Sequence, residues 1–238
     1  MIAAYRWDSN WKVSVLLLIL LPLLLSLGNW QLQRAEEKRQ LQQLYDAQRA
    51  LPPLPVVQLS AVAEARYRRI LLRGHYDNRR SVLLDNRTQG GIAGYHVLSP
   101  FVASDGRRFL VNRGWLAGGG DRRQLPSIPA VDGEVELLAS VYVPLGAAFV
   151  LQHDQWREQW PLVVQWEDIA RLEQRFDGSL FPYSLRLEPN QVGALTVDWQ
   201  PINTRPEKHS GYALQWFSMA AALLIFWLCS SLQRREQQ

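Results

Sequence analysis

This chain of 238 residues has little cysteine, a small net charge and few clusters of basic residues. Its only cysteine is Cys229, so the sequence allows no intrachain disulfide and no cysteine-based metal site. The formal net charge is only +4, and no basic block is interleaved with aromatic residues as in a nucleic-acid channel. We therefore expect no nucleic-acid partner.

The short motifs of common enzymes are also missing. The sequence contains no GxSxG elbow, no GxxxxGK[ST] or GxGxxG phosphate loop, and no HxxxH or HExxH zinc spacing. We interpret His75, His96 and His153 as ordinary loop or strand histidines. A periplasmic hydrolase or lipid-modifying enzyme would need a nucleophile with a base beside it, and the sequence displays none. We expect that the protein is not an enzyme.

What the sequence does contain is a long uncharged stretch near its C-terminus. No residue between Tyr212 and Leu232 has a formal charge, and a helix of this length, at about 1.5 Å per residue, matches the hydrocarbon thickness of a bilayer. His209 lies just before this stretch. On a continuous helix it shares a face with Tyr212, Ala213 and Trp216. The pattern predicts a transmembrane helix with a histidine at its interfacial start.

A second apolar run, Val13–Leu27, lies near the N-terminus between Trp11 and Trp30. Two interpretations fit it: a retained membrane anchor of about twenty residues, or a signal peptide with a cleavage-like Ser26-Leu27-Gly28. The following segment, Gln31–Arg49, is rich in helix formers and contains no breaker. This continuity favours the anchor.

Two spans place both chain ends on one side of the membrane and the long central segment on the other. Basic residues near the two sides are almost balanced, so the positive-inside rule leaves the sidedness open. We divide the chain into an N-terminal tail at 1–12, a first transmembrane helix at 13–30, a helical extension at 31–50, a β-rich domain at 51–207, a second transmembrane helix at 208–232 and a C-terminal tail at 233–238.

The central segment has the pattern of a β domain. Short apolar runs between Gly, Pro, Asn and Asp turns predict strands, with a hairpin turn at Ser104-Asp105-Gly106 and one short helix over Trp166–Arg175. The predicted strands are 68–73, 81–86, 95–101, 108–112, 134–142, 183–187 and 195–199. The fold class that we expect is an α+β membrane protein in which two transmembrane helices flank a β-rich antiparallel barrel or sandwich.

Gln31, Arg34 and Lys38 fall on one helical face just beyond the first span. Two cations four residues apart repel each other by about 0.2–0.5 kcal/mol in an isolated helix, so the pair attracts an anion. Lipid phosphate, a neighbouring carboxylate such as Glu37, and the carboxylates of a bound ligand all fit this role.

Two predicted strands end in the same dipeptide, Asn86-Arg87 and Asn112-Arg113. The asparagines and arginines could simply close turns, with Asn capping backbone groups. Alternatively, the two arginines line one rim of the barrel facing the membrane.

Taken together, four motifs resemble the Surfeit locus protein 1 family, which assembles the haem-copper terminal oxidase cytochrome c oxidase. Their order, between two terminal spans, also matches that family. The motifs are Gly28-x-Trp30-Gln31-x-x-Arg34-x-x-x-Lys38, Leu84-Asp85-Asn86-Arg87 followed by Gly94, Val111-Asn112-Arg113-Gly114-Trp115, and His209-x-x-Tyr212-Ala213-x-x-Trp216.

The resemblance implies a chaperone of respiratory chain complex IV biogenesis that assists the delivery of haem a to subunit I, or its insertion there. It implies subunit I and haem a synthase as partners, besides membrane lipid. It also implies a bacterial member that is a multi-pass protein of the inner (cytoplasmic) membrane, with its central domain in the periplasm.

Carried over residue by residue, the resemblance makes His209 the expected axial ligand of the iron of a transiently bound haem a. Tyr212 and Trp216 would then lie along the apolar tail, and Arg34 or Lys38 would hold the propionates. A scaffold that binds oxidase subunits without holding haem is the alternative.

The chain departs from the family pattern beside this histidine. Ser210-Gly211 replaces the usual leucine and polar residue, and Phe217 stands where a tyrosine is common. A glycine at the helix start costs up to about 1 kcal/mol of helix stability.

Overall fold

The structure is a computed structural model that describes residues 5–7, 10–59, 65–120, 124–144, 156, 158–176, 178–200 and 205–234. His153 and parts of both predicted tails lie outside these ranges. The chain divides into two compact units, one formed by Met1–Gln43 with Pro201–Gln238 and the other by Leu44–Gln200.

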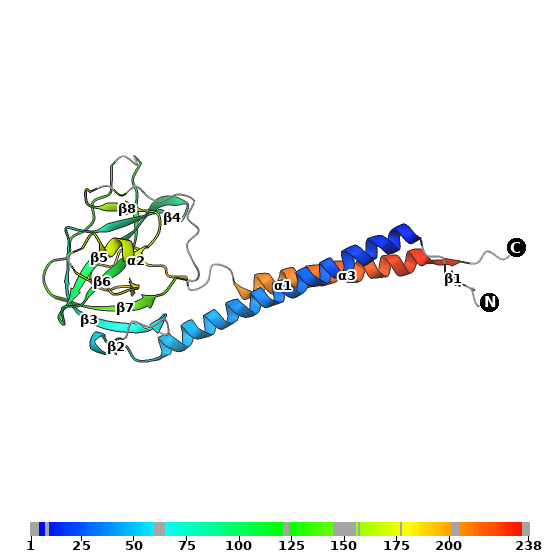
Figure 1. The fold of residues 1–238 in the computed structure, drawn as a ribbon, viewed down its shortest axis with the longest axis horizontal. Helices are drawn as coiled ribbons and strands as arrows, with labels where there is room; N and C mark the ends of the chain where they lie inside the picture. Colours follow the sequence, from blue (N-terminus) through cyan, green and yellow to red (C-terminus); the bar gives the residue numbers. More distant parts are fainter. Residues whose placement is uncertain are drawn as a thin grey trace. The chain divides into compact units, whose positions relative to one another are not determined.

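Two long helices, α1 (Trp11–Ala50) and α3 (Pro206–Ser231), have 40 and 26 residues (Figure 1). Both are long and apolar enough to cross a membrane. The side chain of Asn10 begins α1 by accepting the N–H of Lys12 at 3.1 Å. Pro206 begins α3 in the first turn, where its missing N–H costs nothing.

The segments beyond the membrane helices pair with each other. Strand β1 (Tyr5–Trp7) is antiparallel to β10 (Leu232–Arg234), with Tyr5 opposite Arg234. The described ends of the chain therefore lie side by side at one end of the helix pair (Figure 1). The sequence analysis did not predict these strands.

Within the first unit, α1 and α3 run antiparallel and meet along a seam with a seven-residue period. Spacings of three and four residues separate the shielded positions on each helix, as in a left-handed coiled coil. On α1 these are Ser14, Leu17, Leu21, Leu24, Gly28, Gln31, Ala35 and Lys38, and on α3 they are Pro206, His209, Ala213, Trp216, Ala220, Leu223 and Trp227. Helices in lipid need such close contact, because burial of apolar surface does not drive them together.

Small residues bring the two backbones close at the middle of the seam. Ala35, Ala213 and Ala220 are almost completely buried. A Cβ added to Gly28 would lie 2.5 Å from Cε1 of Phe217, which is closer than carbon atoms can approach. The ring of Phe217 therefore packs directly against the α1 backbone at Gly28.

The second unit is a β domain. Its main strands are β3 (Arg69–Tyr76), β4 (Val82–Gln89), β5 (Ile92–Ala103), β6 (Arg108–Ala117), β7 (Val135–Tyr142) and β9 (Ser184–Leu187), with the short β2 (Leu54–Pro55) and β8 (Leu162–Val164) at the edges. In the described part of the chain these strands form an eight-stranded sheet in the order β2-β3-β7-β9-β6-β5-β4-β8. An additional pairing of β3 with β5 joins β3, β7, β9, β6 and β5 into a closed ring. The sheet is therefore a barrel, as the sequence pattern allowed.

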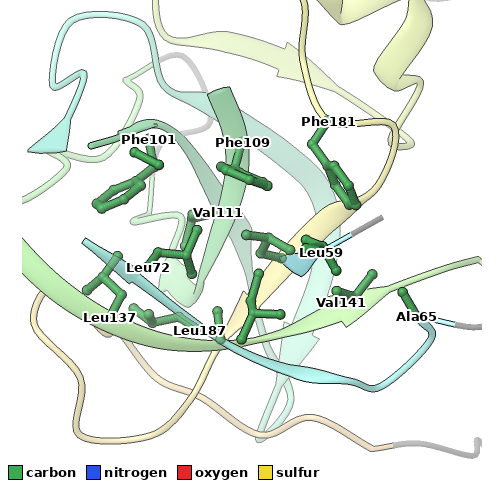
Figure 2. Packing of buried hydrophobic residues seen from close by; sticks show 14 of the residues in the cluster. Leu59, Ala65, Leu72, Phe101, Phe109, Val111, Leu137, Val141, Phe181 and Leu187 are labelled. Atoms are coloured by element: carbon green, nitrogen blue, oxygen red, sulfur yellow. The ribbon is translucent and has the colours of Figure 1, made fainter. Parts of the chain in front are cut away.

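The barrel core consists of alternate residues from these strands. In β3, buried and less buried residues alternate, so Ile70, Leu72, Gly74 and Tyr76 share one face. Figure 2 shows Leu72 among Phe101, Phe109, Val111, Leu137 and Leu187, which come from the five strands of the ring or their ends. Tyr76 and Phe101 meet edge to face at 5.1 Å.

The last turn of α1 belongs to the β domain. Arg49 donates two hydrogen bonds of 2.8 Å to the carboxylate of Glu188, which follows β9. Glu188 is buried and also accepts from the hydroxyl of Ser140. Tyr45 packs edge to face on Tyr67 at 5.2 Å. The charge of Glu188 is thus compensated inside the domain.

Most predicted elements are confirmed with shifted ends, and two expectations are wrong. The segment 195–199 is not a strand, because it forms only an isolated bridge to β6, between Thr196 and Trp115, with one more backbone hydrogen bond from Leu195 to Arg113. Gly114 of β6 has a φ of +110° and lies where the pairing of β5 with β6 shifts register. The domain is also not purely antiparallel, since β2–β3, β4–β8 and β6–β9 pair in parallel.

The predicted helix over 166–175 is shorter than expected. Helix α2 spans Ile169–Glu173, and it begins after Asp168, whose side chain accepts the N–H of Arg171. The hairpin turn at 104–106 joins β5 to β6 as predicted, with Gly106 at a φ of +85°. The fold class itself, two terminal apolar helices flanking a β-rich domain, is confirmed.

Gly28→Ala is expected to loosen the helix pair, because its new methyl group overlaps the ring of Phe217. Overpacking of this kind costs about 1–3 kcal/mol. Thermal unfolding of the full chain in mild detergent should show a lower Tm, and Phe217→Leu in the same chain should restore most of it. Equal Tm values for the wild type and Gly28→Ala would contradict the close approach.

Candidate functional site

The candidate ligand His209 lies on the seam in the first turn of α3 and is half-buried. Its Nδ1 lies 2.8 Å from Oε1 of Gln31 on α1. The ring is therefore turned toward the neighbouring helix and bound to it. Next to it, Ser210 accepts a 3.0 Å hydrogen bond from Arg39 of α1. Two cross-helix contacts thus hold this end of α3.

The predicted aromatic partners lie differently on α3. Trp216 is half-buried on the seam two turns beyond His209, whereas Tyr212 lies beside the seam with 51% of its surface exposed. Ala213 and Ala220 continue the seam with small side chains. Tyr212 therefore presents its ring to the surroundings of the helix pair, one turn beyond the half-buried His209.

The predicted cations also differ from each other. Arg34 is exposed, contacts Glu37 at 2.7 Å and lies 5.7 Å from the ring centre of Trp30. Of the anions expected to attract this cation, Arg34 therefore contacts the neighbouring carboxylate of Glu37. Lys38 lies on the seam with Gln31 and is half-buried. Its ammonium group is at the end of the helix pair that includes His209.

A second polar contact joins the helices near their other end. Nε1 of Trp227 donates to Oγ of Ser14 at 2.9 Å. Ser14 and Gln31 are separated by 17 residues of α1, or about 25 Å along a helix, which is close to the thickness of a membrane core. Polar side chains that bridge helices in lipid stabilise the pair.

In the β domain, residues of the family-like motifs contact one another and have a structural role. Nε1 of Trp115 donates to the carbonyl oxygen of Arg87 at 2.9 Å. A Cβ on Gly94 would lie 2.7 Å from the same indole ring. Asn86 has a φ of +57° at the irregularity of β4, where pairing with β5 shifts register. These residues shape the β4–β5–β6 region and do not form a catalytic constellation.

Arg113 has only 2% of its surface exposed, so the alternative that it lines an open rim is wrong. Its Nε donates to the carbonyl oxygen of Gly193 at 2.7 Å, and its guanidinium lies 5.3 Å from the ring centre of Tyr76. Burial lowers the pKa of Arg113. The side chain of Asn112 accepts the N–H of Gly114, as expected of a turn-closing asparagine.

A half-buried cluster that was not predicted from the sequence surrounds Arg186 in β9. Its guanidinium lies 3.7 Å from the ring centre of Tyr142 and 4.9 Å from that of Trp199. His96 packs edge to face on Trp199 at 5.4 Å. Because Arg186 alternates with two leucines in its strand, periodicity alone places it on the outer face and gives no sign of these partners.

The β domain also has a polar cleft of about 840 Å³. Its basic side chains are His75, Arg79, Arg80 and Arg108. Asp77 compensates Arg80 at 2.7 Å. Among the described residues, no group of three or more His, Cys, Asp or Glu side chains is placed to hold a metal ion.

Comparison with known proteins agrees with this architecture. A family model described as the SURF1 family matches residues 18–221, which includes most of α1, the barrel and the first part of α3. The chain belongs to the SURF1 family. The Surfeit locus protein 1 of Xenopus tropicalis is 29% identical over 89% of this chain and 73% of its own length.

Two further relatives extend the comparison. A SURF1-like protein of Rickettsia felis is 23% identical over 91% of this chain and 96% of its own length. The cytochrome oxidase assembly protein SHY1 of Saccharomyces cerevisiae is 26% identical over 44% of this chain and 28% of its own length. The family recognised from the motifs is therefore confirmed.

The pH dependence of stability is expected to depend partly on His96. Burial, followed by the charges of Arg87 and Arg186, lowers the pKa of His96 from 6.5 to about 4. Between these values the unfolded chain binds the extra proton, so stability is full above pH 6.5 and is lost as the pH falls. When the pH falls from about 7 to about 5, we expect His96 to lower the free energy of unfolding by about 1–2 kcal/mol, allowing for its partial exposure.

The measurement is chemical unfolding of the full chain, followed by tryptophan fluorescence at both pH values. His96→Phe keeps a ring against Trp199 but cannot take up the proton, so its stability should fall less with acidification. Equal pH dependence in the two proteins would show that His96 is not a buried neutral group.

Proposed function

We propose that this SURF1-family chain is a non-enzymatic assembly factor for a haem-copper terminal oxidase, cytochrome c oxidase. We further propose that it holds haem a transiently and passes it to subunit I. Family membership and the name of the yeast relative support the assembly role. The observation that most supports the haem role is the orientation of His209 toward α1, with Nδ1 bound to Gln31 at 2.8 Å.

The residues around His209 fit a haem. With Nδ1 engaged, Nε2 is the ring nitrogen left to ligate an iron, and a single neutral imidazole is an ordinary haem ligand. When bound, the haem would supply an iron that can take the imidazole nitrogen of His209 as a ligand. Tyr212, which is exposed beside the seam, and Trp216, which is half-buried on it, offer apolar surface for its hydrocarbon tail.

Cations at the same end of the helix pair suit the propionates. Lys38 lies on the same stripe of α1 as Gln31 and is the better placed of the two predicted cations. Arg34 would have to share its guanidinium with Glu37, which it contacts at 2.7 Å. A charge-assisted contact to a propionate would hold the porphyrin edge at the membrane surface.

We propose the inner membrane of a bacterium as the location, with the β domain in the periplasm. The relative from Rickettsia felis, which aligns over nearly its full length, supports a bacterial setting. Subunit I and haem a synthase are the proposed partners, because a haem held at a membrane surface must come from a membrane source and pass to a membrane acceptor.

His209→Ala should remove co-purified haem a from the full chain isolated in mild detergent from cells that make haem a. The loss should exceed tenfold in the absorbance ratio of haem to protein, because the iron loses its protein ligand. His75→Ala, at an exposed position of the β domain, is the matched control and should keep the haem.

Haem-free wild-type protein, purified from the same cells, would contradict the haem role. Haem retained by His209→Ala at the wild-type level would show that another residue is the ligand. Circular dichroism of both variants must match the wild type for either conclusion.

A scaffold without haem is the second candidate function, and one observation favours it. The contact between His209 and Gln31 resembles the contact between Trp227 and Ser14 at the other end of the helices, where no ligand is expected. If both are only interhelical hydrogen bonds, the protein would capture subunit I equally well with and without His209.

The proposed orientation also has a direct test. Since β1 and β10 pair, both chain ends lie on one side. A fluorescent reporter that folds only in the cytoplasm, fused after Gln238, should be bright, and the same reporter inserted in the exposed turn at Gly90-Gly91 should be dark. The reverse pattern would place the β domain in the cytoplasm.

A further inference from the structure

We propose that Gln31 is a positioning residue that fixes the tautomer and direction of the His209 ring, so that Nε2 is presented as the ligating atom. The inference rests on the proposed haem role, which it deepens by assigning a function to a residue of the opposite helix. It predicts that the haem site needs both helices, although only α3 supplies the ligand.

The hydrogen bond itself determines which ring nitrogen has the proton. The atom of Gln31 that faces the ring is Oε1, a carbonyl oxygen that can only accept. In the arrangement that we propose, Nδ1 of His209 is the donor to this oxygen, at 2.8 Å. In a neutral imidazole the other nitrogen then keeps its lone pair. Without such a partner, the neutral ring would divide between its two tautomers.

The position of Gln31 on α1 makes this contact well defined. It lies on the seam between Gly28 and Ala35, the two small residues that let the helices approach. At this separation the amide reaches the facing histidine directly. Arg39 anchors the neighbouring Ser210 at 3.0 Å, so two consecutive residues at the start of α3 are hydrogen-bonded to α1.

The expected size of the effect follows from other metal sites. Groups that orient a ligating histidine through its second nitrogen typically change metal affinity about 10–100-fold when they are removed. Gln31→Met removes the acceptor but keeps the length and packing of the side chain. Gln31→Glu keeps an acceptor of the same length and should preserve the tautomer.

The test has two independent readouts on the full chain in mild detergent. The first uses histidine labelled with ¹⁵N in both ring nitrogens, at a pH where the rings are neutral. The chain has four histidines, and the signals that vanish in His209→Ala identify the ring of interest. The second is titration with haem a, followed by absorbance. Ser14→Ala, which removes the contact to Trp227, controls for general loosening of the helix pair.

We expect the wild type and Gln31→Glu to have the Nδ1 proton and to bind haem a within a few-fold of each other. Gln31→Met should show mixed tautomers and about 10–100-fold weaker binding, while Ser14→Ala binds like the wild type. Haem a bound equally by the wild type and Gln31→Met, with unchanged ring signals, would overturn the inference and leave the haem role standing. Wild-type protein that binds no haem a would overturn both. Equal weakening in Gln31→Met and Ser14→Ala would reduce Gln31 to a packing residue.

Discussion

The close antiparallel contact between α1 and α3 is the constraint on which the site depends. A seven-residue period of shielded positions, with glycine and alanine at its tightest points, lets the two backbones approach where no hydrophobic driving force acts between helices. At that separation an amide on one helix can reach an imidazole on the other. The seam therefore determines both the stability of the anchor and the direction of His209, and a change at Gly28 would affect the two together.

The β domain has a different physical basis. Its ring of strands closes through the long β5, which pairs with β4 along its first part and with β3 at its end. The motif residues Arg87, Gly94 and Trp115 are in contact in this region, so their spacing reflects how the barrel is built. Buried charges are handled locally, as in the pair of Arg49 with Glu188. The family motifs thus fall into two groups: those in the barrel shape the domain, and those on the helices form the candidate site.

The fold class could be predicted because its signals are long or periodic. The twenty-one uncharged residues from Tyr212 to Leu232 predict a membrane-spanning helix, and the alternating apolar residues of β3 predict a strand. The segment 195–199 was mistaken for a strand because its composition suits one, whereas its pairing with β6 amounts to a single isolated bridge. His209 could be singled out from its position just before an apolar run. Its partner Gln31 could not be predicted, because only the register of two helices far apart in the sequence brings the two side chains together. The stacking of Arg186 on Tyr142 and Trp199 could not be predicted either, because it also depends on contacts between segments far apart in the sequence.

Cross-linking across the seam tests the central claim most directly. In a Cys229→Ser background, cysteines replacing Gln31 and His209 should be joined rapidly by a short bifunctional thiol reagent in the native membrane. Cysteines replacing Gln33 and His209 should not, because Gln33 is exposed on the opposite face of α1. Equal cross-linking of both pairs, or none of the first, would contradict the register of the helices and with it the account of the site.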